Sequence, residues 1–239
     1  MTLFLTSSPS GCPFEPGPDI PVLDTRNHLV ANLRAVWPDH AVQGLAIAAD
    51  PRAHDANDAM CRAFLQAFAD AHLPLTDLVP CDGRNAEEIA SLLEHSGFVL
   101  LCGGHVPTQN QFFARLGLPG LFHHYHGIVM GVSAGSMNAA RIVYAAPEEP
   151  GEAADPHYSR WLNGLGLTRT RILPHYQFIR DHVLDIALAD SRRHHFLALP
   201  DGSYILCADG SEALYGKAWY FADGTMEEIN EDEDVLPLR

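Results

Sequence analysis

The sequence predicts an α/β fold: a three-layer α/β/α sandwich with a mostly parallel central sheet and antiparallel strands toward the C-terminus. Short apolar runs alternate with segments of helical periodicity over the first 145 residues, as βαβ units require. Beyond residue 195, short strands are separated by Asp-Gly turns at 201–202, 209–210 and 223–224. A length of 239 residues with 47% hydrophobic residues fits a single domain with a large core.

The predicted strands of the first half are apolar runs of four to six residues, which suit a buried parallel sheet. They lie at 3–6, 44–49, 75–79, 97–102 and 128–132. The predicted helices carry apolar residues at three- or four-residue spacing, as Met60, Phe64 and Phe68 do. They lie at 26–36, 55–71, 86–95, 108–116 and from 134 onward.

The pattern changes after residue 145. Residues 147–156 are acidic and rich in proline, which predicts a surface loop. A short strand at 172–173 precedes a helix at 178–189. Four further strands are expected to extend the sheet in antiparallel fashion, at 196–199, 203–207, 213–214 and 217–221. The acidic segment 227–239 is expected to be a solvated tail on the same domain.

The net charge is −15, which disfavours nucleic acids and anionic membranes as partners, because contacts to phosphate need clustered Lys and Arg. No apolar run reaches the length of a membrane span, and the N-terminus lacks the basic region of a signal peptide. The five cysteines are scattered, with no Cys-x-x-Cys pair, and this favours a reducing cytoplasm. They are Cys12, Cys61, Cys81, Cys102 and Cys207.

The stretch from Gly127 to Asn138 is the most informative part of the chain. An apolar strand ends at Gly131-Val132-Ser133-Ala134-Gly135, and small helix-favouring residues follow directly. A serine on a sharp strand-to-helix turn is the pattern of a nucleophile elbow, where the crowded backbone needs small neighbours. The alternative is a glycine-rich turn whose serine merely caps the helix.

A serine nucleophile needs a base, a group that orients the base, and N–H donors for the oxyanion. His175 follows Pro174 at the end of a short strand, and Asp201 lies in a Pro-Asp-Gly turn after another. Each has a structural alternative, as a packed histidine and as a turn residue. Gly103-Gly104 follows the most apolar strand, where a glycine backbone could turn its N–H groups toward a ligand.

These motifs together resemble the dipeptidase E (aspartyl dipeptidase) family of serine peptidases, in the family's own order. They are the N-terminal strand Leu-Phe-Leu-Thr-Ser-Ser, the Gly-Gly turn with Thr108 nearby, the elbow, Pro174-His175-Tyr176, and Leu-Pro-Asp-Gly at 199–202. The resemblance covers roughly residues 2–229. It implies the class I glutamine amidotransferase-like fold, which is flavodoxin-like, and hydrolysis of small peptides by a Ser-His-Asp triad without a cofactor or metal.

Carried over to this chain, the resemblance implies that Ser133 is the nucleophile and His175 the general base. Asp201 takes the place of a glutamate that orients the histidine. Gly104 and Ala134 match the oxyanion donors, with Gly103 as the less favoured neighbour of Gly104.

The chain departs from the family in two places. His105 occupies the position of a third glycine, and the segment between the predicted base and the predicted acid is shorter. In the family, that segment helps to recognise an N-terminal aspartate. Three arginines fall within it and could bind an anionic side chain: Arg180, Arg192 and Arg193. Because aspartate has a shorter reach than glutamate, Glu148 or Glu149 remains an alternative orienting acid.

Three other functions fit parts of the sequence. An α/β-hydrolase esterase would order its triad as Ser, acid, His; Asp190 and His195 have that order but are only five residues apart. A glutamine amidotransferase would need a cysteine at position 133. A protein that binds a metal or another ligand without catalysis is suggested by the histidines in 123–126, with His105 as a further candidate, but no Cys or Asp completes a set with metal-ligand spacing.

A monomer and a homodimer are both compatible with the sequence.

Overall fold

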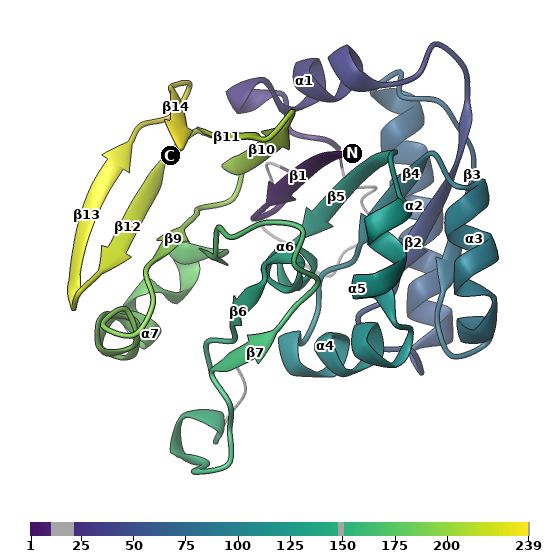
Figure 1. The fold of residues 1–239 in the computed structure, drawn as a ribbon. Coiled ribbons are helices and arrows are strands. Elements are labelled where there is room, and N and C mark those ends of the chain that lie inside the picture. The colour runs from purple at the N-terminus through teal and green to yellow at the C-terminus, as the bar shows by residue number, and fades with distance from the viewer. Residues whose placement is uncertain (11–21, 148–150, 239) are drawn as a thin grey trace.

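The computed structural model describes residues 1–10, 22–147 and 151–238. Its centre is an eight-stranded sheet with helices on both faces, and a smaller sheet stands beside it (Figure 1). The predicted three-layer α/β fold is therefore confirmed. The order across the large sheet is β14 (Val235–Leu238), β11 (Ser211–Tyr215), β10 (Tyr204–Ala208), β1 (Thr2–Thr6), β5 (Ile128–Val132), β4 (Phe98–Leu101), β2 (Val42–Ile47) and β3 (Leu75–Cys81).

The large sheet is parallel from β1 to β3 and antiparallel from β1 to β14. Period-two alternation explains how the strands are covered on both faces: Leu3 and Leu5 enter one core while Phe4 enters the other. One core is closed by α1 (Leu29–Val36), which follows the 3₁₀ turn η1 (Arg26–His28), and by α2 (His54–Asp70).

The helices over the opposite face are α3, α4, α5 and α6. Their bounds, and those of the 3₁₀ turns η2 and η3 in the same part of the chain, are η2 (Ala86–Glu88), α3 (Ile89–His95), α4 (Val106–Arg115), α5 (Leu118–Leu121), η3 (Phe122–His124) and α6 (Ala134–Ala139).

A second sheet corrects the expectation that every C-terminal strand extends the first. Its order is β13 (Thr225–Asn230), β12 (Ala218–Ala222), β9 (Phe196–Ala198) and β8 (Ile172–Leu173). The strands β9 and β12 pair with each other rather than with β10, because α7 (Tyr176–Asp190) supplies them with a core of their own. Tyr176 and Val183 of α7 are buried there with Phe196 and Phe221.

Three further elements lie outside the predicted pattern. β6 (Ile142–Tyr144) and β7 (Trp161–Asn163) form a small antiparallel pair, and the 3₁₀ turn η4 (Glu152–Ala154) lies between them in the chain. The acidic segment expected as a tail contains β13 and β14 instead, although its carboxylates from Glu227 to Asp234 are mostly exposed. No helix in the described ranges combines the length and apolar character that crossing a bilayer requires.

Because β1 to β5 run parallel, their carboxyl ends meet at one edge of the sheet. The register pairs Thr6 with Val132 across β1 and β5, and Leu101 with Gly131 across β4 and β5. The residues that follow these strands therefore lie side by side at this edge. They include Ser7 and Ser133.

The turn after β5 is packed tightly enough to exclude side chains. A Cβ on Gly135 would lie 2.1 Å from the carbonyl oxygen of Leu101, and one on Gly131 would lie 2.6 Å from Ser136 Oγ. Glycine at these positions lets α6 begin directly against β4 and β5. The sharp turn thus depends on close backbone packing as well as on local conformation.

Replacing Gly135 by alanine is expected to destabilise the fold by more than about 2 kcal/mol, because the new methyl group meets backbone that cannot move aside. Urea unfolding measures this. The control is Gly120→Ala in α5, where a Cβ meets nothing within 4 Å and stability should be unchanged or slightly higher. Equal stability of Gly135→Ala and the wild type would show that α6 is not held in this way.

Candidate active site

Ser133 has the backbone geometry of an elbow residue. It lies between β5 and α6 with φ 50° and ψ −113°, a conformation that non-glycine residues rarely adopt. Its N–H donates to the carbonyl oxygens of Thr6 and Ser7, each at 3.1 Å. The end of β1 thus holds the strained turn in place, and the serine itself stays partly exposed.

The predicted oxyanion donors flank this serine. A Cβ on Gly103 would lie 3.5 Å from Ser133 Cβ. Gly104 has φ 152°, and a Cβ there would lie 2.5 Å from Ala49 Cβ, so the position requires glycine. Ala134 is the first residue of α6, so its N–H has no partner within the helix. Gly103 and Gly104 are exposed residues, and their N–H groups donate no hydrogen bond to the described residues.

His175 and Asp201 form a hydrogen-bonded pair, with 2.7 Å between His175 Nδ1 and Asp201 Oδ1. The imidazole side chain is 30% exposed and the carboxylate 8%, so the ring is accessible while the acid is shielded. Burial raises the pKa of Asp201, but the hydrogen bonds from His175 and Ser7, together with the charge of the imidazole, outweigh it and lower that pKa below its ordinary value.

This pairing determines the tautomer that the neutral ring adopts. An ionised carboxylate only accepts hydrogen bonds, so the proton of neutral His175 must sit on Nδ1, facing Asp201. The lone pair is then on Nε2. A histidine in this state is ready to accept a proton from a neighbouring hydroxyl.

Ser7 is a residue of the site that the sequence did not single out. Its hydroxyl lies 2.8 Å from Asp201 Oδ1 and 2.8 Å from the backbone nitrogen of His175. Its carbonyl accepts the N–H of Ser133. The backbone nitrogens of Ser133 and His175 are therefore at most roughly 10 Å apart. Gln177 also contributes, because its Oε1 accepts the N–H of Asp201 at 3.0 Å.

The three arginines lie at different distances from this site. Arg180 is exposed on α7, about a turn and a half beyond His175. Arg192 and Arg193 follow the far end of the helix, roughly 20 Å away, since α7 has 15 residues. Glu148 and Glu149, the alternative orienting acids, lie outside the described residues.

The pair proposed for an esterase is not formed. Asp190 instead binds Arg160 Nη1 at 2.9 Å and the hydroxyl of Tyr144 at 3.0 Å, while His195 contacts the ring of Tyr220. Among the described residues, Asp190 and His195 therefore do not form the hydrogen-bonded pair that an esterase triad would need.

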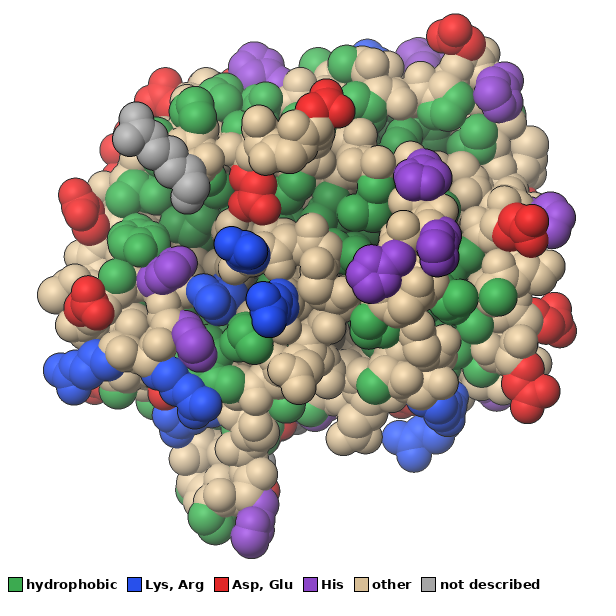
Figure 2. Space-filling model, viewed as in Figure 1, with side chains coloured by type: hydrophobic (Ala, Val, Ile, Leu, Met, Phe, Trp, Pro, Cys, Tyr) green, Lys and Arg blue, Asp and Glu red, His purple; other side chains and the backbone are tan. Residues whose placement is uncertain are grey.

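The histidine-rich segment forms no metal site among the described residues. Figure 2 shows exposed histidines scattered over the face in view, a few of them adjacent to one another. His123, His124 and His126 are exposed. His105 is engaged elsewhere: its ring lies 2.7 Å from Thr108 Oγ1 and 2.8 Å from Glu152 Oε1.

The described cysteines are poorly suited to act as nucleophiles. Cys61, Cys81 and Cys102 are buried, and Cys207 is half-buried; Cys12 lies outside the described residues. Burial raises the pKa of Cys61 and of Cys81 to about 12, so their thiolates are scarce near neutral pH.

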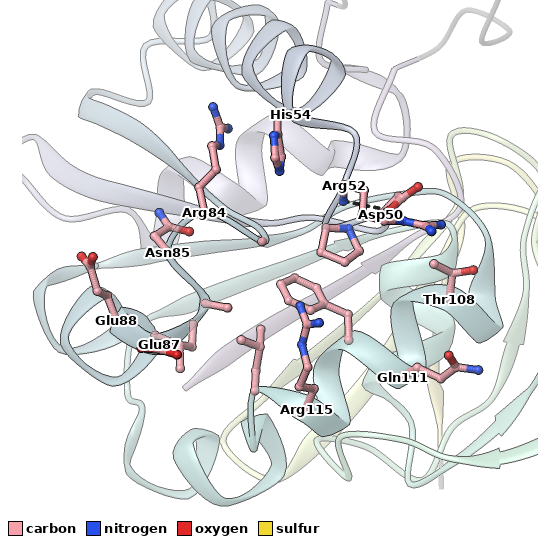
Figure 3. Close-up of a pocket in the computed structure, with 16 residues that line it drawn as sticks. Asp50, Arg52, His54, Arg84, Asn85, Glu87, Glu88, Thr108, Gln111 and Arg115 are labelled. Carbon is pink, nitrogen blue, oxygen red and sulfur yellow. Dashed lines mark hydrogen bonds and ion pairs between the residues drawn. The ribbon is translucent and has the colours of Figure 1, made fainter.

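A pocket of about 1340 Å³ opens along α4 (Figure 3). Charged side chains line it, including the pair of Asp50 with Arg52, and Arg115 extends into it from α4. Ser133, His175 and Asp201 are absent from its lining. The pocket is therefore separate from the candidate active site and lies toward the β2 and β3 side of the molecule.

Comparison with known proteins identifies the family. The model of peptidase family S51 matches residues 42–214, which is more than half of the chain. The chain belongs to this family. Family S51 is the dipeptidase E family, so the chain is a serine peptidase that acts on peptide substrates, as the sequence motifs predicted. No curated protein sequence gives a significant match.

Two solved structures share the fold of this S51 peptidase. A peptidase from an acI-B1 Actinobacterium has a TM-score of 0.67 at 14% identity, with 99% of this chain and 96% of that one covered. A protein from Listeria monocytogenes EGD-e that is named as a peptidase E has a TM-score of 0.55 at 15% identity, with 96% and 98% covered. At such identities the likeness concerns the fold alone.

The lowered pKa of Asp201 makes stability depend on pH. The carboxylate interactions stabilise the fold above the pKa of the unfolded state, ordinarily near 3.8, and are lost as pH falls toward the lower folded value. Urea unfolding of the wild type and Asp201→Asn should therefore show a stability difference that shrinks below about pH 4. A stability difference between the two proteins that stays constant across this pH range would contradict the hydrogen-bonded pair of His175 and Asp201.

Proposed function

We propose that this S51 peptidase hydrolyses small peptides through a triad of Ser133, His175 and Asp201, by way of an acyl-enzyme. The supporting observation is the residue Ser7 at the end of β1. It binds the backbone of the elbow serine on one side and the hydrogen-bonded His175–Asp201 pair on the other. The proposed nucleophile, base and orienting acid are thus all linked to the residue that ends β1.

In the first half of the proposed reaction, Ser133 Oγ attacks the carbonyl carbon of the scissile bond while His175 Nε2 takes its proton. Asp201 stabilises the imidazolium that forms, without becoming protonated itself. The same imidazolium then gives the proton to the leaving nitrogen, and the C–N bond breaks. The product amine departs and leaves an ester on Ser133.

The tetrahedral oxyanion is proposed to accept hydrogen bonds from the N–H groups of Gly104 and Ala134, with Gly103 as the less favoured donor. The positive end of α6 points to the same place, although this helix is short. Each such donor contributes roughly 2.7–4 kcal/mol to stabilisation of the transition state. In the second half of the reaction, His175 activates water, which attacks the ester and releases the acid product.

The proposed substrates are small peptides, including dipeptides with an N-terminal aspartate. Arg180 is the arginine whose position suits recognition of an acidic side chain, because it lies on the helix that starts at His175. No cofactor or metal enters these steps. We propose the cytoplasm as compartment, on the scattered cysteines of the sequence, and a monomer or homodimer as the working form.

Removing either reacting group should abolish turnover. Ser133→Ala and His175→Ala are expected to lower kcat by more than about a thousandfold on a panel of dipeptides and p-nitroanilides. Ser133→Ala should change thermal unfolding little, whereas His175→Ala should also lower thermal stability, because it leaves the buried Asp201 carboxylate without the imidazole. The matched control is His182→Ala, an exposed histidine on the same helix, which should keep wild-type rates.

A fluorophosphonate gives a second readout that needs no substrate. The reagent should label wild-type Ser133 rapidly and His175→Ala slowly, because phosphonylation uses the same base. Undiminished hydrolysis by Ser133→Ala, or labelling at another serine alone, would refute the triad.

Substituting Arg180 tests whether this side chain gives the enzyme specificity for an N-terminal aspartate. Arg180→Gln should raise KM for Asp-X dipeptides about tenfold while leaving KM for Ala-X dipeptides unchanged, since a lost ion pair affects only the charged substrate. Arg193→Gln, at the far end of α7, is the control and should affect neither. Equal effects of Arg180→Gln on both substrate series would exclude a role in charge recognition.

A further inference from the structure

We propose that Ser7 is a positioning residue for catalysis: its side chain fixes the carboxylate of Asp201 and the backbone of His175 relative to each other. This inference rests on the proposed triad. It assigns a function to a buried hydroxyl that takes no direct part in the chemistry of bond cleavage.

The direction of both hydrogen bonds follows from the groups involved. The backbone N–H of His175 can only donate, so at 2.8 Å it donates to Ser7 Oγ. Ser7 Oγ keeps its own proton for Asp201 Oδ1, also at 2.8 Å, because the ionised carboxylate only accepts. The hydroxyl is thus fully oriented: it accepts from one catalytic segment and donates to the other.

The main chain of Ser7 is held as firmly as its side chain. Its N–H donates to the carbonyl of Ser203 at 3.2 Å, and its carbonyl accepts the N–H of Ser133 at 3.1 Å. The residue is 0% exposed, so water does not replace these partners. One residue therefore links the elbow, the base and the turn that carries the acid.

The contact matters most for His175 because that residue has an uncommon backbone conformation. Its φ of 55° and ψ of 27° are left-handed, which costs a non-glycine residue about 1 kcal/mol or more. The bond to Ser7 Oγ holds the N–H side of this strained residue, while Nδ1 is held by Asp201. Without the Ser7 hydroxyl, the backbone of His175 and the carboxylate of Asp201 each lose a hydrogen bond that fixes their position.

A buried serine could also serve stability alone, and the chain contains a matched example. Ser136 is likewise 0% exposed and donates to the carbonyl of Thr6 at 2.8 Å, one residue before Ser7. It contacts neither His175 nor Asp201 in the hydrogen bonds of the described residues. Comparing Ser7→Ala with Ser136→Ala therefore separates positioning from stability.

The experiment is a double-mutant cycle on kcat with a dipeptide substrate. Ser7→Ala should lower kcat about ten- to a hundredfold with KM within about threefold of wild type, the loss expected for one or two hydrogen bonds around a buried carboxylate. In an Asp201→Asn background the same substitution should cost less than about threefold, because a residue that acts through Asp201 has little left to position. Ser136→Ala should change kcat by less than about threefold in both backgrounds.

The outcomes separate the inference from the proposed function. Equal losses from Ser7→Ala in both backgrounds, or a loss no larger than that of Ser136→Ala, would overturn the positioning role while leaving Ser133-dependent hydrolysis intact. Absence of Ser133-dependent hydrolysis in the wild type would instead overturn the triad. If Ser7→Ala fails to fold by circular dichroism, Ser7→Cys decides the question: its thiol is a weak donor and acceptor, so wild-type kcat would contradict the role and a loss of about tenfold would support it.

Discussion

The parallel pairing of β1 with β5 is the contact on which the site depends. It places Thr6 opposite Val132, so the next residues in both strands are the two serines that meet at the sheet edge. The other edge of β1 pairs with β10 in antiparallel fashion, with Thr6 opposite Tyr204, and this brings the turn at Asp201 to the same place. A slip of one residue in either pairing would turn the hydroxyl of Ser7 away from its partners.

Two residues with strained backbones are both hydrogen-bonded to Ser7. Ser133 and His175 both have positive φ, and neither is glycine. Such conformations persist where surrounding contacts over-determine them, and here the contacts are the carbonyl of Ser7 for one residue and its hydroxyl for the other. The strained backbones thus belong to the two residues proposed to react. Both are held by hydrogen bonds from the end of β1, whose own residues have no positive φ.

Much of this arrangement could be predicted from the sequence, because it rests on local patterns. The strand before the elbow was predicted with its observed bounds, because it is an apolar run that ends where small residues begin. Small residues at that point are the pattern of a sharp turn. Three of the four strands of the second sheet were predicted, but not their separation from the large sheet, because strand partners are set by long-range pairing. The pair of β6 with β7 was missed, because three-residue strands carry no periodicity. Ser7 was missed for another reason: its partners are 168 and 194 residues away, and Thr-Ser-Ser is simply the polar end of a strand until the sheet register is known.

In the proposed reaction, Ser133 carries the acyl group during turnover. The most direct measurement is acid quenching of the enzyme during hydrolysis of an activated aminoacyl ester, followed by mass spectrometry of the proteolysed protein. We expect the aminoacyl mass on the peptide that contains Ser133, and no adduct in His175→Ala. An adduct on any other residue, or steady turnover with Ser133 unmodified and replaceable, would contradict it.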